Sequence, residues 1–198
     1  MAVLEGNLLF VGLGNPGEDY DNTYHNMGFM AMDTLADTLG KKVSKKECLG
    51  SLCVFSKNNE NVVLLKPDTF MNNSGQSVKA VMAKYDVTAS NVFIIYDDID
   101  IPRFTVRARR NGSAGTHNGM KSVIAELSSS EFPRIRIGIG KEPGELVKFV
   151  LSKTVPTERA VFNEVFKKTA EVLAGFIADR DFDKLMRTIN LIDFSGKV

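Results

Sequence analysis

The chain has 198 residues, of which 43% are hydrophobic and 25% charged, with a formal net charge of +1 at pH 7. This composition is typical of a soluble globular protein with one core, and no apolar run approaches the roughly 20 residues needed to span a bilayer. The N-terminus lacks a basic region followed by a long apolar run, and the only cysteines, Cys48 and Cys53, are too few for a disulfide framework, so we expect a cytoplasmic protein with reduced thiols.

Strands and helices are predicted to alternate along most of the chain. In chain order we expect a strand at Leu8–Val11, a helix at 26–39, strands at 49–55 and 62–65, a helix at 74–85, strands at 91–96 and 104–109, a helix at 118–127, a strand at 135–139, and helices at 157–178 and 181–191. This alternation predicts one α/β domain over residues 1–198 with a mostly parallel central sheet. A tight turn between the strands of Cys53 and Val63 predicts an antiparallel edge, and the helices from about residue 157 are expected to pack on the same core.

The positive charge is unevenly distributed. Residues 101–125 contain no acidic side chain, and their basic residues are Arg103, Arg107, Arg109, Arg110 and Lys121. This segment is equally compatible with a solvated basic face and with a phosphate-binding patch on an otherwise neutral protein.

The segment Gly12–Gly17 matches the pattern G-x-G-x-x-G after a strand, which by itself suggests a dinucleotide-binding oxidoreductase. The residues that follow argue against it, because Glu18, Asp19 and Asp21 would repel a pyrophosphate and the next helix begins too late. Instead, the glycines would let the chain turn tightly after the strand and place Asn15 in a crevice at the end of the sheet.

Only two histidines are present, His25 and His117, so few side chains can exchange a proton near neutral pH. Other polar or aromatic residues expected near strand ends are Asn15, Tyr20, Phe70, Asn72, Asp97 and Asn118. A parallel sheet would bring them to one rim. The sequence shows no serine-nucleophile motif, no recognisable cysteine–histidine pair and no zinc-ligand spacing. A histidine base, a carboxylate and asparagine amides suit hydrolysis of an activated carbonyl, such as an ester, by water.

Each of these residues also has an ordinary structural interpretation. His25 would cap or pack at a helix start, Asp97 would be a turn residue, and Asn72 and Asn118 would be helix N-caps. The residues alone leave open which histidine is the base.

Several segments, in the same order, closely resemble the bacterial-type peptidyl-tRNA hydrolase family between about Leu8 and Val150. They are Val11–Gly17, Tyr20, Thr23–Gly28, Lys66–Gly75, Tyr96–Pro102, His117–Lys121 and Arg134–Gly140. The resemblance implies one α/β domain with a twisted, mixed, mostly parallel sheet surrounded by helices. It also implies a cytoplasmic monomer without metal or cofactor that cleaves the ester between a peptide and the 3′ end of tRNA, recycling tRNA released from stalled ribosomes.

The resemblance also implies roles for individual residues. His25 would be the general base that activates water, Asp97 would hold its imidazole, and Asn15 would help to distinguish peptidyl from aminoacyl ends. The residues implied to bind substrate or tRNA are Tyr20, Phe70, Asn72, His117 and Asn118 around the 3′ end, and Arg107, Arg109 and Arg136 toward phosphate.

The sequence departs from the family at three positions. Tyr24 stands where the family usually has arginine, and Ala114 and Thr116 stand where glycine is common. If these two positions need a positive φ, the loop before His117 must follow another path. An alternative is therefore a non-catalytic RNA-binding protein on the same scaffold, although such a protein would have no need of the His25–Asp97 pair.

Overall fold

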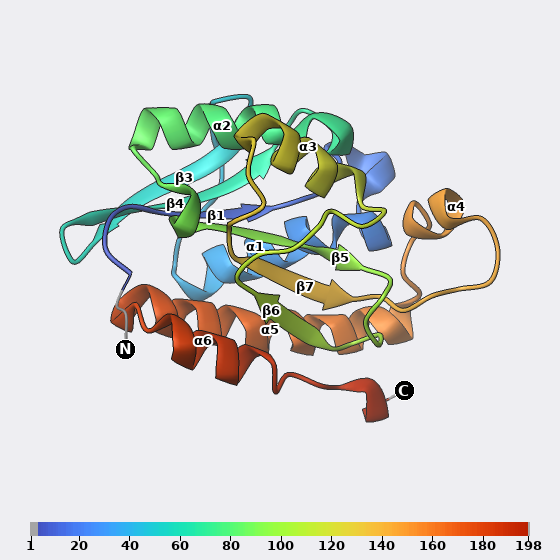
Figure 1. The fold of residues 1–198 in the computed structure, drawn as a ribbon. Helices are drawn as coiled ribbons and strands as arrows, with labels where there is room; N and C mark the ends of the chain where they lie inside the picture. The colour runs from blue at the N-terminus through green and yellow to red at the C-terminus, as the bar shows by residue number, and fades with distance from the viewer. Residues whose placement is uncertain (1–3, 198) are drawn as a thin grey trace.

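A seven-stranded sheet of order β2-β3-β4-β1-β5-β7-β6 forms the centre of the computed structural model, which describes residues 4–197 (Figure 1). Its strands are β1 (Leu8–Gly12), β2 (Lys45–Glu47), β3 (Gly50–Lys57), β4 (Glu60–Pro67), β5 (Val92–Asp98), β6 (Val106–Arg109) and β7 (Arg134–Gly138). The α-helices are α1 (Met27–Thr38), α2 (Ser74–Tyr85), α3 (Asn118–Leu127), α4 (Leu146–Val150), α5 (Pro156–Asp179) and α6 (Phe182–Ile189).

The four central strands, β4, β1, β5 and β7, run parallel, and antiparallel strands flank them on both sides. Val54 pairs with Val63 in the antiparallel β3–β4 hairpin, so the predicted antiparallel edge is confirmed. Because β4, β1 and β5 are parallel neighbours, their carboxyl ends reach the same rim of the sheet, where open α/β sheets bind ligands.

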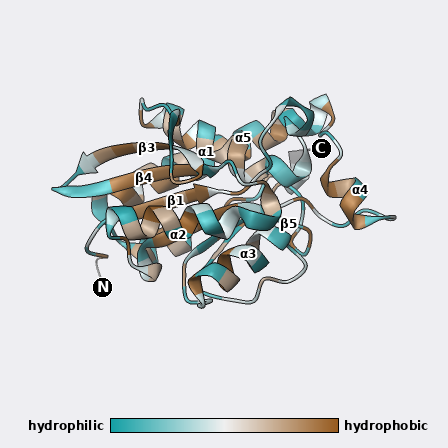
Figure 2. Ribbon diagram, turned by 90° about the horizontal axis from the view of Figure 1, so that it is seen from above, coloured by the Kyte–Doolittle hydropathy of each residue, from teal (hydrophilic) through white to brown (hydrophobic). Residues whose placement is uncertain are grey.

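Alternating side chains of the sheet pack against two helical layers. In β1, Leu8 and Phe10 join a core with α1, α5 and α6, while Leu9 and Val11 join a second core with α2 and α3. The buried stretches of β1, β4 and β5 are hydrophobic, namely Leu8–Val11, Val62–Leu65 and Val92–Tyr96, whereas the helices carry both polar and apolar residues (Figure 2). This is the pattern expected for parallel strands buried on both sides.

Helix α1 lies unusually close to the sheet. A Cβ atom on Gly12 would lie 2.2 Å from the carbonyl oxygen of Gly28, and one on Gly28 would lie 2.3 Å from that of Ile95. Neither position has room for a side chain. The first glycine of the G-x-G-x-x-G motif therefore serves helix–sheet packing, and this packing brings His25 beside the end of β5.

Helices α2 and α3 have the predicted bounds, but one strand and one α-helix were not predicted. These are β2, a charged three-residue strand at the sheet edge, and α4, a five-residue helix that projects beside the carboxyl rim (Figure 1). Strand β5 also runs further than predicted, because Asp97 and Asp98 pair with Ile137 and Gly138 of β7. None of the helices that the structure describes is long and apolar enough to cross a membrane.

Candidate active site

A cavity of about 350 Å³ opens at the carboxyl rim of the sheet. Its walls come from the loops after β1 and β4, the end of β5, the start of α3 and, on the opposite side, α4. All eight non-arginine residues predicted for the site line it, namely Asn15, Tyr20, His25, Phe70, Asn72, Asp97, His117 and Asn118. The predicted convergence of these residues is thus present in the fold, whereas the three predicted arginines lie outside the cavity lining.

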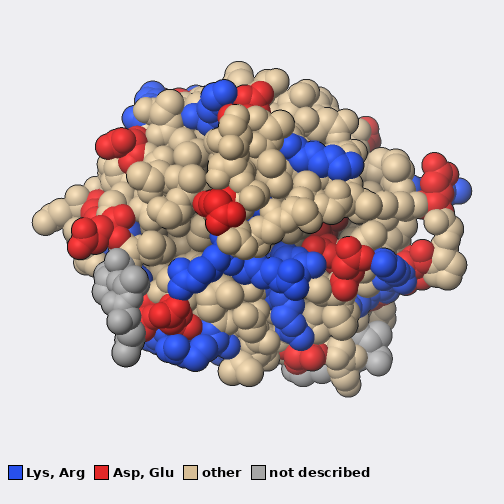
Figure 3. Space-filling model, in the orientation of Figure 1, with Lys and Arg blue, Asp and Glu red and all other residues tan. Residues whose placement is uncertain are grey.

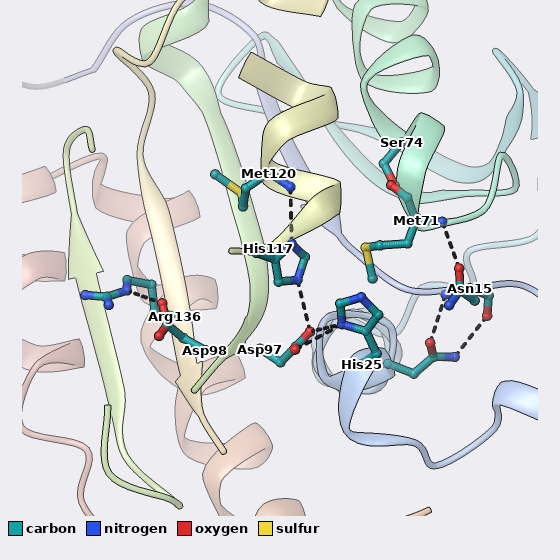
Figure 4. A network of polar contacts seen from close by, with 10 residues as sticks. Asn15, His25, Met71, Ser74, Asp97, Asp98, His117, Met120 and Arg136 are labelled. Atoms are coloured by element: carbon teal, nitrogen blue, oxygen red, sulfur yellow. Dashed lines mark hydrogen bonds and ion pairs between the residues drawn. The ribbon is translucent and has the colours of Figure 1, made fainter. Parts of the chain in front are cut away.

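The carboxylate of Asp97 lies between the two imidazoles (Figure 4). His25 Nδ1 is 3.0 Å from Asp97 Oδ2, and His117 Nε2 is 3.2 Å from Oδ1. The side chains of Asp97, His117 and His25 are only 3%, 9% and 12% exposed. A buried carboxylate needs such donors, since leaving it unpaired would be costly.

A backbone amide and the Asp97 carboxylate determine which nitrogen of each histidine carries its proton. The amide of Met120 donates to His117 Nδ1 at 3.2 Å, so the proton of neutral His117 is on Nε2, where it donates to Asp97. His25 uses its Nδ1–H toward the same carboxylate and makes no hydrogen bond through Nε2 to the described residues. Both nitrogens of His117 are therefore occupied, and only His25 offers a lone pair to the cavity.

Electrostatics reinforce this arrangement. Burial alone would lower the pKa of His25, but the charge and hydrogen bond of Asp97 more than offset it, so the pKa lies above the ordinary 6.5. Burial would raise the pKa of Asp97, yet the two histidines bring it well below its usual range. Asp97 is therefore ionised throughout the neutral range, and it makes His25 a stronger base.

The same three residues are a candidate metal site by distance, because their ligand atoms lie within 4.8 Å of one another. The hydrogen bonding does not suit a metal ion. With Nδ1 of His117 accepting from Met120, its Nε2 carries a proton and has no lone pair for a metal. The arrangement of His25, Asp97 and His117 fits a carboxylate that accepts hydrogen bonds from two imidazoles better than it fits a metal centre.

Asn15 is fixed by a second network on the other side of His25. Its Oδ1 accepts the Met71 amide at 2.8 Å, which leaves its Nδ2 group as the hydrogen-bond donor for a ligand (Figure 4). The side chain of Asn26 holds the Asn15 backbone at both ends, with Oδ1 accepting from N at 2.8 Å and Nδ2 donating to O at 3.0 Å. Asn26, which follows His25 directly, was not among the residues predicted for the site.

The rest of the cavity combines exposed amides with apolar walls. Asn72 and Asn118 are exposed, and neither is a helix N-cap: the residue before α3, His117, caps that helix instead. Phe70 is 52% exposed and has a φ of 54°, a conformation rare for a side chain of this size. Opposite it, α4 contributes the apolar side chains of Leu146 and Val147. These surfaces suit a ligand with both polar backbone and apolar parts.

The arginines predicted to face phosphate have different surroundings. Arg136 Nε is bound to Asp98 at 2.7 Å, and Arg107 NH1 donates to the backbone carbonyls of Val106, Asn190 and Ile192. Arg109, at the end of β6, is exposed, and its guanidinium has no hydrogen bond or ion pair among the described residues. Figure 3 shows lysine and arginine side chains forming a band across the face that carries β6, interrupted by acidic residues.

Tyr24, the first departure from the family, points away from the cavity. Its hydroxyl donates to Glu158 of α5, and its ring packs 4.7 Å from that of Phe149 in α4. Arg103 also binds Glu158 and lies over the Tyr24 ring. Tyr24 thus joins α4 and α5 to the turn before His25 and is not among the residues that line the cavity.

The loop before His117 tolerates its two unusual residues. Within residues 111–116, only Gly112 and Gly115 have a positive φ, at 152° and 56°. Ala114 and Thr116 are outside that region, so neither residue is strained by its backbone conformation in this chain. The loop therefore accommodates both side chains as it stands.

Comparisons with known proteins agree with the geometry. The family model described as Peptidyl-tRNA hydrolase matches residues 9–197. The chain is 42% identical over 174 residues to the peptidyl-tRNA hydrolase of Chloroflexus aggregans, covering 86% of this chain and 93% of that protein. It is 41% identical over 184 residues to that of Halalkalibacterium halodurans, covering 92% and 99%.

A solved structure extends the agreement to the whole fold. The Arg119Gln mutant of peptidyl-tRNA hydrolase from Acinetobacter baumannii superposes with a TM-score of 0.88 at 28% identity, covering 98% of this chain and 99% of that one. The predicted fold class, a mixed, mostly parallel α/β sheet with helices around it, is confirmed. On sequence and fold together, the chain belongs to the peptidyl-tRNA hydrolase family.

Proposed function

We propose that this chain, as a peptidyl-tRNA hydrolase, cleaves the ester between the peptide and the 3′ end of tRNA with His25 as the general base. The observation that carries the proposal is the free Nε2 of His25, which faces the cavity while Nδ1 is bound to Asp97. Nε2 takes a proton from a water molecule as that water attacks the ester carbonyl, and the imidazolium that forms is stabilised by Asp97.

The attack places negative charge on the carbonyl oxygen, which needs hydrogen-bond donors. The amides of Asn15, Asn72 and Asn118 line the same cavity and can supply them. As the intermediate collapses, the bond to the ribose oxygen breaks, and the proton held by His25 passes to that oxygen. The products are a free peptide carboxylate and a free tRNA 3′ end.

Asn15 also accounts for a preference for peptidyl over aminoacyl ends. Because its Oδ1 is occupied by Met71, it presents only an N–H donor. A donor pairs with the carbonyl of an N-blocked residue but offers nothing to the ammonium group of a free aminoacyl end, which is itself a donor. Tyr20 and Phe70, whose rings meet edge to face at 6.1 Å, would hold the terminal base or the first side chain.

Binding of tRNA would depend on phosphate contacts that carry no sequence information, as an enzyme for many tRNAs requires. Arg109 and Lys121 are the exposed cations of the basic segment best suited to this, since Arg107 and Arg136 already have internal partners. We further propose that the enzyme is a monomer, because one chain supplies all the described residues that line the site, and that it is cytoplasmic, because its substrate is a tRNA. Light scattering at micromolar concentration tests the oligomeric state.

The test is hydrolysis of a labelled N-acetyl-aminoacyl-tRNA by the purified chain, with and without EDTA. The matched variant is His25→Asn, whose amide can still donate to Asp97 but has no basic nitrogen. We expect EDTA-resistant cleavage by the wild type and a loss of about 10²-fold or more in the variant. A folded wild type that binds tRNA without cleaving it would instead support the non-catalytic RNA-binding alternative.

A further inference from the structure

The guanidinium of Arg134, at the start of β7, is buried without a carboxylate. Arg134 is 1% exposed and forms no ion pair with the acidic residues that the structure describes. Its NH1 donates to the carbonyl of Ser113 at 2.6 Å, its NH2 donates to that of Ser130 at 3.0 Å, and its Nε has no partner. The ring of Phe132 lies 4.7 Å from the guanidinium carbon, but no carboxylate is bound to it, and a buried charge without a bound counter-charge is costly and calls for an explanation.

The two carbonyl groups belong to residues at opposite ends of helix α3. Ser113 precedes α3 in the loop that leads to His117, and Ser130 follows the end of the helix at Leu127. The planar guanidinium has donors in a fixed fork, so a single side chain joins both ends of α3 to β7. Lysine, with one nitrogen on a flexible stem, cannot reproduce this geometry.

Strand β5 also contacts His117, through the ring of Tyr96. The ring of Tyr96 meets that of His117 edge to face, with centroids 4.9 Å apart. Tyr96 and Arg134 lie on neighbouring strands, since Ile94 and Arg134 are paired residues of β5 and β7. Burial raises the pKa of Tyr96, and the nearby guanidinium of Arg134 opposes this rise.

We propose that Arg134 is a positioning residue for the hydrolysis, which fixes the α3 N-terminus so that His117 donates to Asp97 and Asn118 faces the cavity. It touches no substrate and acts through the loop of residues 113–117. The inference rests on the proposed function, because it assumes that the His25–Asp97–His117 arrangement performs the reaction. Arg134 would thus support the site from outside the cavity, as Asn26 does through the Asn15 backbone.

Arg180 provides a matched control for the loss of a buried arginine. It is 4% exposed, its NH1 donates to the Gly6 carbonyl at 3.0 Å, and its Nε also has no hydrogen-bond partner. Its NH2 lies 3.0 Å from Glu60 Oε2. Gly6 and Glu60 are at the amino ends of β1 and β4, so Arg180 is at the rim opposite the cavity.

The experiment compares Arg134→Lys with Arg180→Lys in three measurements: unfolding by urea, the pH profile of kcat/KM, and the resonances of His25 and His117 after selective ¹⁵N-histidine labelling. Both variants are expected to lose stability. Only Arg134→Lys is expected to lower kcat about tenfold with a smaller change in KM, and to change the His117 resonances. The acid limb of its profile should move to higher pH, because Asp97 released from His117 interacts more strongly with His25.

Two further variants keep the proposal open to refutation. Arg134→Met removes the buried charge without a large cavity and serves if the lysine variant does not fold. In a His117→Ala background, Arg134→Lys should cause no additional shift of the acid limb. The proposal is wrong if Arg134→Lys, like Arg180→Lys, leaves the His117 resonances and the pH profile unchanged. Arg134 would then contribute only to stability. The NMR result stands even if the wild type does not cleave peptidyl-tRNA, so the two proposals fail separately.

Discussion

His25 is joined to Asp97 through Nδ1, 3.0 Å from Oδ2, which leaves Nε2 of the imidazole facing the cavity. This one contact fixes the tautomer, the orientation and the basicity of the only histidine with a free nitrogen.

Asp97→Asn should move the acid limb of the kcat/KM profile to lower pH. The carboxylate is what raises the pKa of His25 above 6.5, whereas burial lowers it, so removing the charge leaves the lowering effect of burial. The rate on the plateau should fall about 100-fold or more, because the imidazolium formed in the reaction loses its counter-charge. A profile measured between pH 5 and 9 checks both effects. An acid limb that stays in place would show that His25 is not the titrating base.

The two histidines should differ sharply in their importance. His25→Ala removes the only free imidazole nitrogen and should reduce kcat by about 10²–10⁴-fold. His117→Ala removes one hydrogen bond to Asp97 and the cap of α3, and we expect a loss of only about tenfold. Single-turnover rates at saturating enzyme give the comparison. The reverse order of effects would transfer the role of base to His117.

Asn15→Asp should weaken the discrimination between substrates more than it weakens folding. The carboxylate can still accept the Met71 amide, but it replaces the N–H donor by a negative charge that attracts an ammonium group. Cleavage of N-acetyl-aminoacyl-tRNA should fall by about tenfold or more, while cleavage of free aminoacyl-tRNA should fall less or rise. The ratio of the two kcat/KM values is the measurement. An equal loss for both substrates would remove Asn15 from substrate discrimination.

Arg109→Ala should raise KM and reduce the slope of log KM against log salt by about 0.7–0.9, the contribution of one phosphate contact. Arg110→Ala is the matched control, because Arg110 is already paired with Asp183 at 2.6 Å. Its effect on the slope should be smaller. Equal slopes for the wild type and Arg109→Ala would indicate that the basic segment is only a solvated face.

Gly115→Ala should destabilise the loop before His117, whereas Ala114→Gly should not restore any activity. Gly115 has a φ of 56° and open space where a Cβ atom would lie, so the cost is conformational and about 1 kcal/mol. Ala114 lies outside the positive-φ region, so glycine there gains nothing in the folded state. Urea unfolding and kcat of the two variants test the assignment. A gain in turnover by Ala114→Gly would mean that the departure from the family pattern limits the enzyme.

The sequence predicted the elements that have strong local signals. The bounds of α2 and α3 were predicted because their apolar residues recur at helical spacing, and the antiparallel edge because a short turn separates two strands. Helix α4 was missed because five residues are too few for periodicity, although it forms one wall of the cavity. Strand β2 was missed because its three residues are charged.

The sequence predicted which residues form the site better than it predicted the hydrogen bonds between them. Parallel strands bring the loops after β1, β4 and β5 together, so the convergence on one rim followed from the predicted parallel direction of the strands. The choice between the histidines did not, because it depends on the Met120 amide bound to His117 Nδ1. Asn26 and Arg134 were missed for a similar reason, since each acts on backbone atoms that only the folded chain brings near.

The most direct test of the central claim is to measure the pKa of each histidine in the free enzyme and compare both with the acid limb of kcat/KM. With only two histidines, selective ¹⁵N labelling resolves each imidazole and its tautomer. We predict that His25 titrates above pH 6.5, carries its proton on Nδ1 when neutral, and has the same pKa as the acid limb. A kinetic pKa that matches His117, or a neutral His25 protonated on Nε2, would contradict the account.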